Sequence, residues 1–125
     1  MELRGTVIKG RQLGRQLGVP TANISLATDA GVERGVYAAR VDGPGLRGAP
    51  AMAYIGSRPA IDDAADGQLT LEVHVLDFEG DLYGAELSLR LGEKVRDEAK
   101  PATIEALRQR IADNLARVRA HFRVP

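Results

Sequence analysis

The segment from Gly14 to Asn23 combines a glycine-containing loop with two oxygen-bearing side chains. Gly14 and Gly18 allow a ligand to approach the backbone, and their exposed N–H groups suit phosphate. Pro20 stiffens the chain that leads into Thr21. Thr21 and Asn23 are two residues apart, so in an extended segment their hydroxyl and amide oxygens face one side and suit a hard cation such as Mg²⁺. The segment predicts nucleotide chemistry, although it lacks the Gly-Lys-Ser/Thr ending of the Walker loop.

A second candidate group lies in the alternating stretch at residues 70–76. Leu71, Val73 and Val75 share one face, while Glu72 and His74 share the other. The strands and the helix described below predict a small barrel with a helix against it. Because the interior of such a barrel is filled with aliphatic side chains, Glu72 should face outwards or into a cleft beneath the helix. A carboxylate on a rigid strand is well placed to act as a general base. Spacing alone favours the alternative of a solvated glutamate beside a surface imidazole, because exposed charges on strands are common.

Most of the remaining chain is predicted to form short strands separated by turns. Asp42-Gly43-Pro44-Gly45 is a strong hairpin signal between two apolar runs. The expected strands cover residues 3–9, 21–26, 36–41, 51–55, 69–76 and 85–91. Six strands with turns at short intervals predict a mainly β fold, a small antiparallel barrel that is closed or nearly closed and ends at about residue 92.

The last part of the chain changes its hydrophobic period. Apolar residues recur every three or four positions at Ile104, Leu107, Ile111, Leu115, Val118 and Phe122. This spacing predicts one C-terminal amphipathic helix over residues 101–122 that covers the barrel. Pro101 is compatible with the first turn, where its missing N–H would have no partner.

The composition narrows the class of protein. The chain has 125 residues, which is the length of one domain, and 17 basic residues balance 17 acidic ones. Balanced charge and 4% aromatic residues argue against a nucleic-acid partner. There is no cysteine, no signal-peptide pattern and no apolar run near the ~20 residues of a membrane-spanning helix. We expect a cytoplasmic monomer that acts on small molecules, with no membrane partner.

Six short motifs follow one another along the chain: GRQLGVPTAN (14–23), GVYA (35–38), IGSRP (55–59), EVHVLDF (72–78), DLYG (81–84) and RDE (96–98). In this order they resemble the ATP-dependent riboflavin kinases, specifically the kinase module at the C-terminal end of bifunctional bacterial FAD synthetases. The resemblance spans nearly the whole chain. It implies a six-stranded Greek-key barrel with one C-terminal helix that converts riboflavin and ATP into FMN and ADP.

The resemblance also implies a role for each matching residue. Glu72 falls on the catalytic base, which accepts the proton of the ribityl 5′-hydroxyl, and Thr21 with Asn23 would hold Mg²⁺. The implied nucleotide-binding residues are Gly10, Gly14, Arg15, Gly18, Pro20, Thr21, Asn23, Asp77, Phe78, Leu82 and Tyr83. The implied flavin-binding residues are Arg96, Glu98, Ile104 and Leu107.

Several alternatives remain at the level of sequence. Phe78 and Tyr83 could equally pack in the core, and Arg96 could form a surface ion pair with Asp97 or Glu98. The chain has Ala60 where many family members have threonine, and Pro101 where an aromatic residue commonly stands near the flavin ring. No adenylyltransferase domain precedes the kinase motifs, so FAD synthesis is not expected. The alternatives to a stand-alone kinase are a non-catalytic flavin- or nucleotide-binding module and an excised domain of a larger synthetase.

Overall fold

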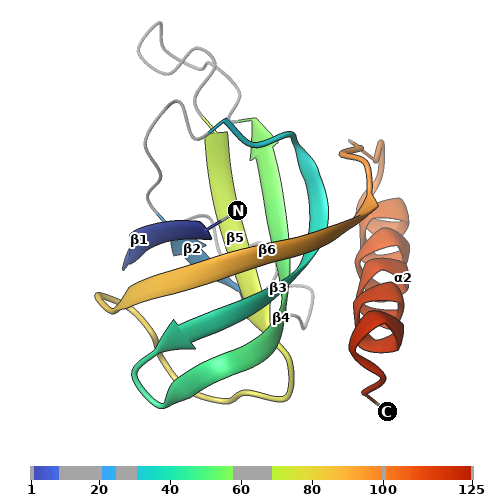
Figure 1. Ribbon diagram of the computed structural model, residues 1–125. Helices are drawn as coiled ribbons and strands as arrows, with labels where there is room; N and C mark the ends of the chain where they lie inside the picture. Colours follow the sequence, from blue (N-terminus) through green and yellow to red (C-terminus); the bar gives the residue numbers. More distant parts are fainter. Residues whose placement is uncertain (1, 9–20, 25–30, 58–68, 100, 125) are drawn as a thin grey trace, which may run out of the picture.

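The computed structural model describes residues 2–8, 21–24, 31–57, 69–99 and 101–124. Six strands precede a helix: β1 (Glu2–Ile8), β2 (Ala22–Ile24), β3 (Gly35–Gly43), β4 (Leu46–Ser57), β5 (Leu69–Val75), β6 (Glu86–Arg96) and α2 (Ile104–Phe122). The strands form a closed antiparallel barrel in the order β1-β2-β5-β4-β3-β6, with α2 standing against one side (Figure 1). Strands β3, β4 and β5 form a meander, and β6 returns beside β3, which is the Greek-key order. The predicted fold class is therefore confirmed.

Aliphatic side chains fill the barrel, as the scarcity of aromatic residues requires. The largest fully buried side chains inside it are Val41, Ile55, Leu71, Val73, Leu87 and Leu89. On β5, Leu71, Val73 and Val75 are buried, whereas Glu72 and His74 are half-buried on the outer face. The predicted alternation of this strand is thus confirmed, and it directs a carboxylate away from the core.

The hairpin between β3 and β4 forms where the turn residues predict it. Gly45 has a φ of +73°, a conformation that an L side chain rarely adopts. The carboxylate of Asp42 accepts a 2.8 Å hydrogen bond from the backbone N–H of Gly48, which closes the turn.

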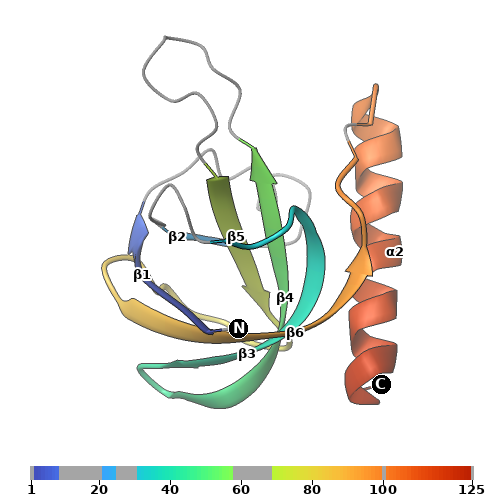
Figure 2. The same ribbon diagram turned by 45° about the horizontal axis from the view of Figure 1, so that its top comes forward.

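Helix α2 covers the outer face of the barrel through a second, smaller apolar cluster. Val118 is fully buried, and Leu115 and Phe122 pack with it against Val36 of β3 and Met52 of β4. Figure 2 shows the helix running along one side of the barrel. None of the helices among the described residues is long and apolar enough to cross a membrane.

The helix begins later than the sequence predicts. Thr103 is the N-cap, and its hydroxyl accepts a 3.0 Å hydrogen bond from the N–H of Ala106. A threonine in this role satisfies an otherwise unpaired N–H, so it determines the start of the helix. Pro101 consequently lies outside the helix, two residues before the cap, rather than in its first turn.

Strand β6 is longer than predicted. It continues to Arg96, past the expected barrel end near residue 92, and stays paired with β3 through Lys94 and Arg96. The register shifts twice in this part of the pairing, and the burial alternation that marks the first half of the strand is lost there. At Gly92 a Cβ atom would lie 3.2 Å from the carbonyl oxygen of Ala38. Gly92 thus lets β6 approach β3 closely, and the end of β6 lies beside α2 (Figure 1).

Candidate functional site

Among the described residues, two clefts border the barrel and share Thr21 as a lining residue. The first, called here the Asn23 cleft, has a volume of about 280 Å³ and is lined by Val7, Ile8, Thr21, Ala22, Asn23, Val73, Val75 and residues 78–83. The second, the Glu72 cleft, has a volume of about 190 Å³ and lies between the barrel and α2. Its lining residues are Thr21, Val36, Met52, Tyr54, Glu72, Asp97, Ala99, Leu107, Arg110, Ile111 and Asn114. Two ligands could therefore meet at Thr21.

The strand register places three polar side chains in one row. Asn23 of β2 is opposite Glu72 of β5, and Glu72 is opposite Tyr54 of β4. Residues paired across neighbouring strands point to the same face, so all three project outwards. The row runs from the Asn23 cleft into the Glu72 cleft, and its central member is the carboxylate.

Glu72 has the environment of a poised base. Its carboxylate accepts a 3.4 Å hydrogen bond from the hydroxyl of Thr21. Burial raises the pKa of Glu72, and the hydrogen bond from Thr21 lowers it by a smaller amount. A raised pKa makes the ionised carboxylate a stronger proton acceptor than an exposed glutamate.

Tyr54 forms the wall of the Glu72 cleft on the β4 side. Its hydroxyl donates a 2.9 Å hydrogen bond to Glu98, which belongs to the segment between β6 and α2. Burial and the hydrogen bond to Glu98 raise the pKa of Tyr54, so the phenol stays a neutral donor. A Cβ atom at Gly56 would lie 2.6–2.8 Å from atoms of the Tyr54 side chain. The glycine thus provides the space in which the tyrosine ring lies.

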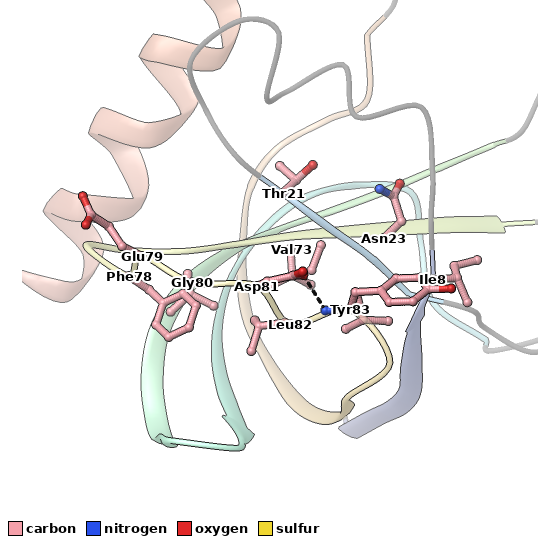
Figure 3. Close-up of a pocket in the computed structure, with 13 residues that line it drawn as sticks. Ile8, Thr21, Asn23, Val73, Phe78, Glu79, Gly80, Asp81, Leu82 and Tyr83 are labelled. Atoms are coloured by element: carbon pink, nitrogen blue, oxygen red, sulfur yellow. Dashed lines mark hydrogen bonds between the residues drawn. The ribbon is translucent and has the colours of Figure 1, made fainter.

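The Asn23 cleft is bounded by the segment between β5 and β6, which we call the 77–84 loop. Figure 3 shows Thr21 and Asn23 on one side of this cleft and residues of the loop on the other. Within the loop, the carboxylate of Asp81 accepts a 2.9 Å hydrogen bond from the N–H of Tyr83. The loop returns to the barrel where the N–H of Gly84 donates a 3.0 Å hydrogen bond to the carbonyl of Val7. Its ends are therefore fixed to β5 and β1.

The aromatic residues of this loop differ in their surroundings. Phe78 packs partly against the barrel core and also lines the Asn23 cleft, so both sequence interpretations apply to it. Tyr83 is 59% exposed and lines the same cleft, so the interpretation as a core residue is wrong for it.

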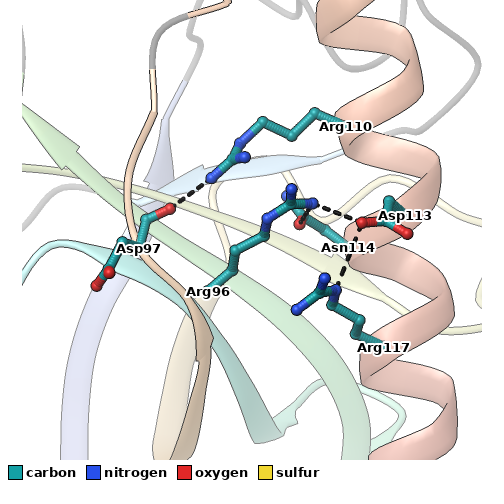
Figure 4. A network of polar contacts seen from close by, with 6 residues as sticks. All are labelled: Arg96, Asp97, Arg110, Asp113, Asn114 and Arg117. Atoms are coloured by element: carbon teal, nitrogen blue, oxygen red, sulfur yellow. Dashed lines mark hydrogen bonds and ion pairs between the residues drawn. The ribbon is translucent and has the colours of Figure 1, made fainter.

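Arg96 connects the end of β6 to α2 rather than to its sequence neighbours. Its guanidinium lies 2.6 Å from the carboxylate of Asp113 and donates a 3.3 Å hydrogen bond to the side chain of Asn114 (Figure 4). Asp113 also pairs with Arg117 at 3.4 Å. The predicted alternative, an ion pair of Arg96 with Asp97 or Glu98, is wrong for the described residues, because the helix supplies a nearer carboxylate.

The structure brings together part of the predicted flavin-binding set. Leu107 lines the Glu72 cleft, and Glu98 reaches its edge through Tyr54. Ile104 is 57% exposed in the first turn of α2 and is not among the described residues that line this cleft. Ile104 does not line the cleft because the apolar stripe of α2 that contacts the barrel begins at Leu107. Arg96 lies beside the cleft, on a shallower surface with Pro101 and Asp113.

The predicted nucleotide-binding residues also divide into groups. Those that line the Asn23 cleft are Thr21, Asn23, Phe78, Leu82 and Tyr83. Asp77 is not among the described lining residues, and its carboxylate binds Arg119 of α2. The predictions for Gly10, Gly14, Arg15, Gly18 and Pro20 lie outside the described residues, as does Ala60.

Sequence reasoning missed four polar residues of the Glu72 cleft: Tyr54, Asp97, Arg110 and Asn114. Asn114 carries a detectable signal, because it lies three residues after Ile111 and four before Val118, inside the apolar stripe of α2. It is only 6% exposed. A polar residue within an apolar stripe indicates a specific partner, which here is Arg96.

In the described part of the chain, a closed six-stranded Greek-key barrel, one helix and two clefts that meet beside a partly buried carboxylate define a small two-cleft β-barrel module. The riboflavin kinase (flavokinase) family matches residues 1–122. The chain therefore belongs to the riboflavin kinase family, as its motifs predict.

Two of the similar proteins are described as riboflavin kinases, and a third is described differently. The bifunctional riboflavin kinase/FMN adenylyltransferase of Pseudomonas fluorescens is 43% identical over 118 residues, which cover 94% of this chain and 37% of that protein. The chain thus spans well under half the length of this curated relative. The crystal structure of riboflavin kinase from Trypanosoma brucei matches 99% of this chain and 80% of its own, with a TM-score of 0.68 and 28% identity. A Streptococcus pneumoniae structure described as a macrolide-efflux protein matches 94% of this chain and 38% of its own, with a TM-score of 0.78 and 26% identity.

Proposed function

We propose that this chain transfers the γ-phosphoryl group of ATP to the ribityl 5′-hydroxyl of riboflavin, giving FMN and ADP. One observation carries the proposal: Thr21 lines both clefts and donates a hydrogen bond to Glu72 where they meet. Transfer between two substrates needs two adjoining sites with a proton acceptor at the junction. Membership of the riboflavin kinase family supplies the identity of the two substrates.

The Asn23 cleft is the proposed site of the nucleotide. Thr21 and Asn23 supply polar oxygens on the side that faces the 77–84 loop, which itself contributes Glu79 and Asp81 to the lining. A hydroxyl and an amide carbonyl are hard neutral ligands, so these residues fit Mg²⁺, which usually binds through few protein groups and completes its shell with phosphate oxygens and water. Mg²⁺ bound there would neutralise charge on the phosphates.

The Glu72 cleft is the proposed site of riboflavin. Apolar side chains of Val36, Met52, Leu107 and Ile111 line its walls, and polar groups occupy its edges. Such a cleft fits a flat, largely apolar ring system with polar atoms at its rim. The ribityl chain would then extend past Glu72 towards Thr21.

Glu72 would act as the general base. Its carboxylate accepts the proton of the ribityl 5′-hydroxyl as the oxygen of that hydroxyl bonds to the γ-phosphorus, and the bond from this phosphorus to the β–γ bridging oxygen breaks to release ADP. Partial burial, which raises the pKa of Glu72, strengthens it as an acceptor. The hydroxyl of Thr21 holds the carboxylate in place by donating a hydrogen bond to its Oε1. Because phosphoryl transfer depends chiefly on positioning, this short set of residues suffices.

A turnover assay tests the proposal. The chain is incubated with riboflavin, ATP and Mg²⁺, and FMN and ADP are measured by chromatography. Equal amounts of FMN and ADP are expected. Binding of riboflavin without FMN formation would contradict the kinase assignment and favour the non-catalytic binding module. We also propose that the chain works in the cytoplasm, as a monomer and without a nucleic-acid partner. Sedimentation of the purified chain would test the proposed monomeric state.

A further inference from the structure

The 77–84 loop leaves β5 through an unusual backbone conformation. Asp77, its first residue, has a φ of +56°, one of two positive φ values at non-glycine residues in the described part of the chain. Aspartate tolerates this left-handed region better than most residues, but it still needs surrounding contacts to hold it there. The direction in which the chain leaves β5 therefore depends on what binds Asp77.

Arg119 of α2 provides that contact. Its guanidinium makes a two-pronged interaction with the Asp77 carboxylate, at 2.6 Å to Oδ1 and 3.3 Å to Oδ2. This planar geometry orients the carboxylate as well as attracting it. The hydrogen bonds from Arg119 hold the pKa of Asp77 below its usual value, so the pair stays charged through the neutral range.

The helix is a firm support for this contact. Val118, the neighbour of Arg119, is fully buried and belongs to the same apolar cluster as Leu76, the neighbour of Asp77. The N–H of Leu76 donates a 3.0 Å hydrogen bond to the carbonyl of Pro50, which fixes the end of β5. The ion pair thus extends a packed contact by one residue on each side.

We infer that Arg119 is a positioning residue for the nucleotide side of the site. By holding Asp77 in the left-handed conformation, it fixes the direction of the 77–84 loop and so the wall of the Asn23 cleft. Helix α2 then serves both clefts: Leu107, Ile111 and Asn114 line the Glu72 cleft, and Arg119 acts one turn beyond them through the loop. This inference rests on the proposed function for the identity of the ligands.

The test compares Arg119→Met with Arg117→Met, a matched control on the same helix. Arg117 forms an ion pair with Asp113 within α2 and does not contact the loop in any described interaction. For Arg119→Met we expect the KM for ATP to rise by about three- to five-fold, the scale of a well-aligned but solvent-accessible ion pair, while the KM for riboflavin stays within about two-fold. Arg117→Met should leave both values near those of the unaltered chain.

Two further variants separate positioning from simple loss of structure. Arg119→Lys keeps one charge and should restore part of the ATP affinity. Asp77→Asn keeps the preference for a left-handed backbone but removes the ion pair, so it should match Arg119→Met. The double variant Arg119→Met/Asp77→Asn should be no worse than either single one.

Three results would overturn the inference. They are an unchanged KM for ATP in folded Arg119→Met, an equal rise in the KM for riboflavin, and additive effects in the double variant. If Arg119→Met does not fold, the Asp77→Asn and Arg119→Lys comparison decides in its place. Calorimetric titration with ADP and Mg²⁺ gives the same comparison without turnover. If the chain makes no FMN, the proposed function is contradicted, but the ADP affinities of the variants still decide the role of Arg119.

Discussion

The hydroxyl of Thr21 donates a 3.4 Å hydrogen bond to the carboxylate of Glu72, across the boundary between the two clefts. The same hydroxyl lines the Asn23 cleft. A change at Thr21 should therefore affect the binding of both ligands, whereas a change at Asn23, which among the described lining residues belongs only to the first cleft, should affect one.

Removing the carboxylate should slow catalysis strongly but leave binding intact. For Glu72→Gln we expect at least ~100-fold slower FMN formation, the usual scale for loss of a general base. Affinities for riboflavin and ATP should stay near those of the unaltered chain, because glutamine has the same shape. Steady-state turnover and flavin fluorescence titration measure the two properties.

The matched control for this change is Glu86→Gln, since Glu86 is also a strand glutamate but is exposed on β6. It should retain full activity. Turnover of Glu72→Gln within ten-fold of the unaltered chain would rule out Glu72 as the base.

The Glu72→Gln substitution should also stabilise the fold at neutral pH. The pKa of Glu72 is raised in the folded chain, so the ionised carboxylate is less favourable there than in the unfolded chain. Its contribution to stability is favourable below the unfolded pKa of about 4.3 and is lost as the pH rises through the folded value. Glu72→Gln should therefore unfold at a higher urea concentration than the unaltered chain at pH ~7.5, with the difference shrinking at acidic pH.

Urea titrations of both chains at several pH values measure this difference. The explanation would be contradicted if Glu72→Gln were less stable than the unaltered chain at neutral pH. It would also be contradicted if the difference in urea midpoint were the same at every pH, because burial would then not raise the pKa of Glu72.

Asn23 should affect nucleotide and metal more than flavin. For Asn23→Ala we expect the KM for Mg·ATP to rise by about ten-fold or more, as for losses of groups that support a bound metal. The dissociation constant for riboflavin should change little, because Asn23 is absent from the described lining of the Glu72 cleft. Thr21→Ala, in contrast, should weaken both. Equal weakening of the two substrates by Asn23→Ala would contradict the metal assignment.

Gly56 should be sensitive to the addition of one methyl group. In Gly56→Ala the new Cβ would meet the Tyr54 side chain at 2.6–2.8 Å, so the ring must shift from the position in which its hydroxyl bonds to Glu98. We expect a loss of about 1–3 kcal/mol in the free energy of unfolding, typical of overpacking, together with weaker riboflavin binding. In a Tyr54→Ala background, Gly56→Ala has no ring to displace, so it should change the free energy of unfolding little. The same cost in both backgrounds, measured by urea unfolding, would contradict this explanation.

Local patterns carried most of the sequence predictions that the structure confirms. The alternation around Glu72 determines its face because strand periodicity depends only on neighbouring residues. The apolar stripe of α2 predicts its packing face in the same way. Both features can be read from fewer than twenty consecutive residues.

The contacts that were missed join distant segments. Tyr54 meets Glu98 across 44 positions, and Arg96 meets Asp113 across 17. Which carboxylate Arg96 selects depends on how far β6 continues and on the start of α2 at its Thr103 cap. Neither follows from composition or period, because tertiary packing decides them.

The closed barrel has a further consequence, for the order in which the chain can fold. Its seam joins the first strand to the last, pairing Glu2 with Arg90 and Leu3 with Leu89. A contact of such long range forms slowly, since the ends of a large loop must be brought together first. During synthesis the apolar side chains of Leu3 and Val7 stay uncovered until β6 has left the ribosome, so the seam is the step at which a nascent chain is most exposed to aggregation.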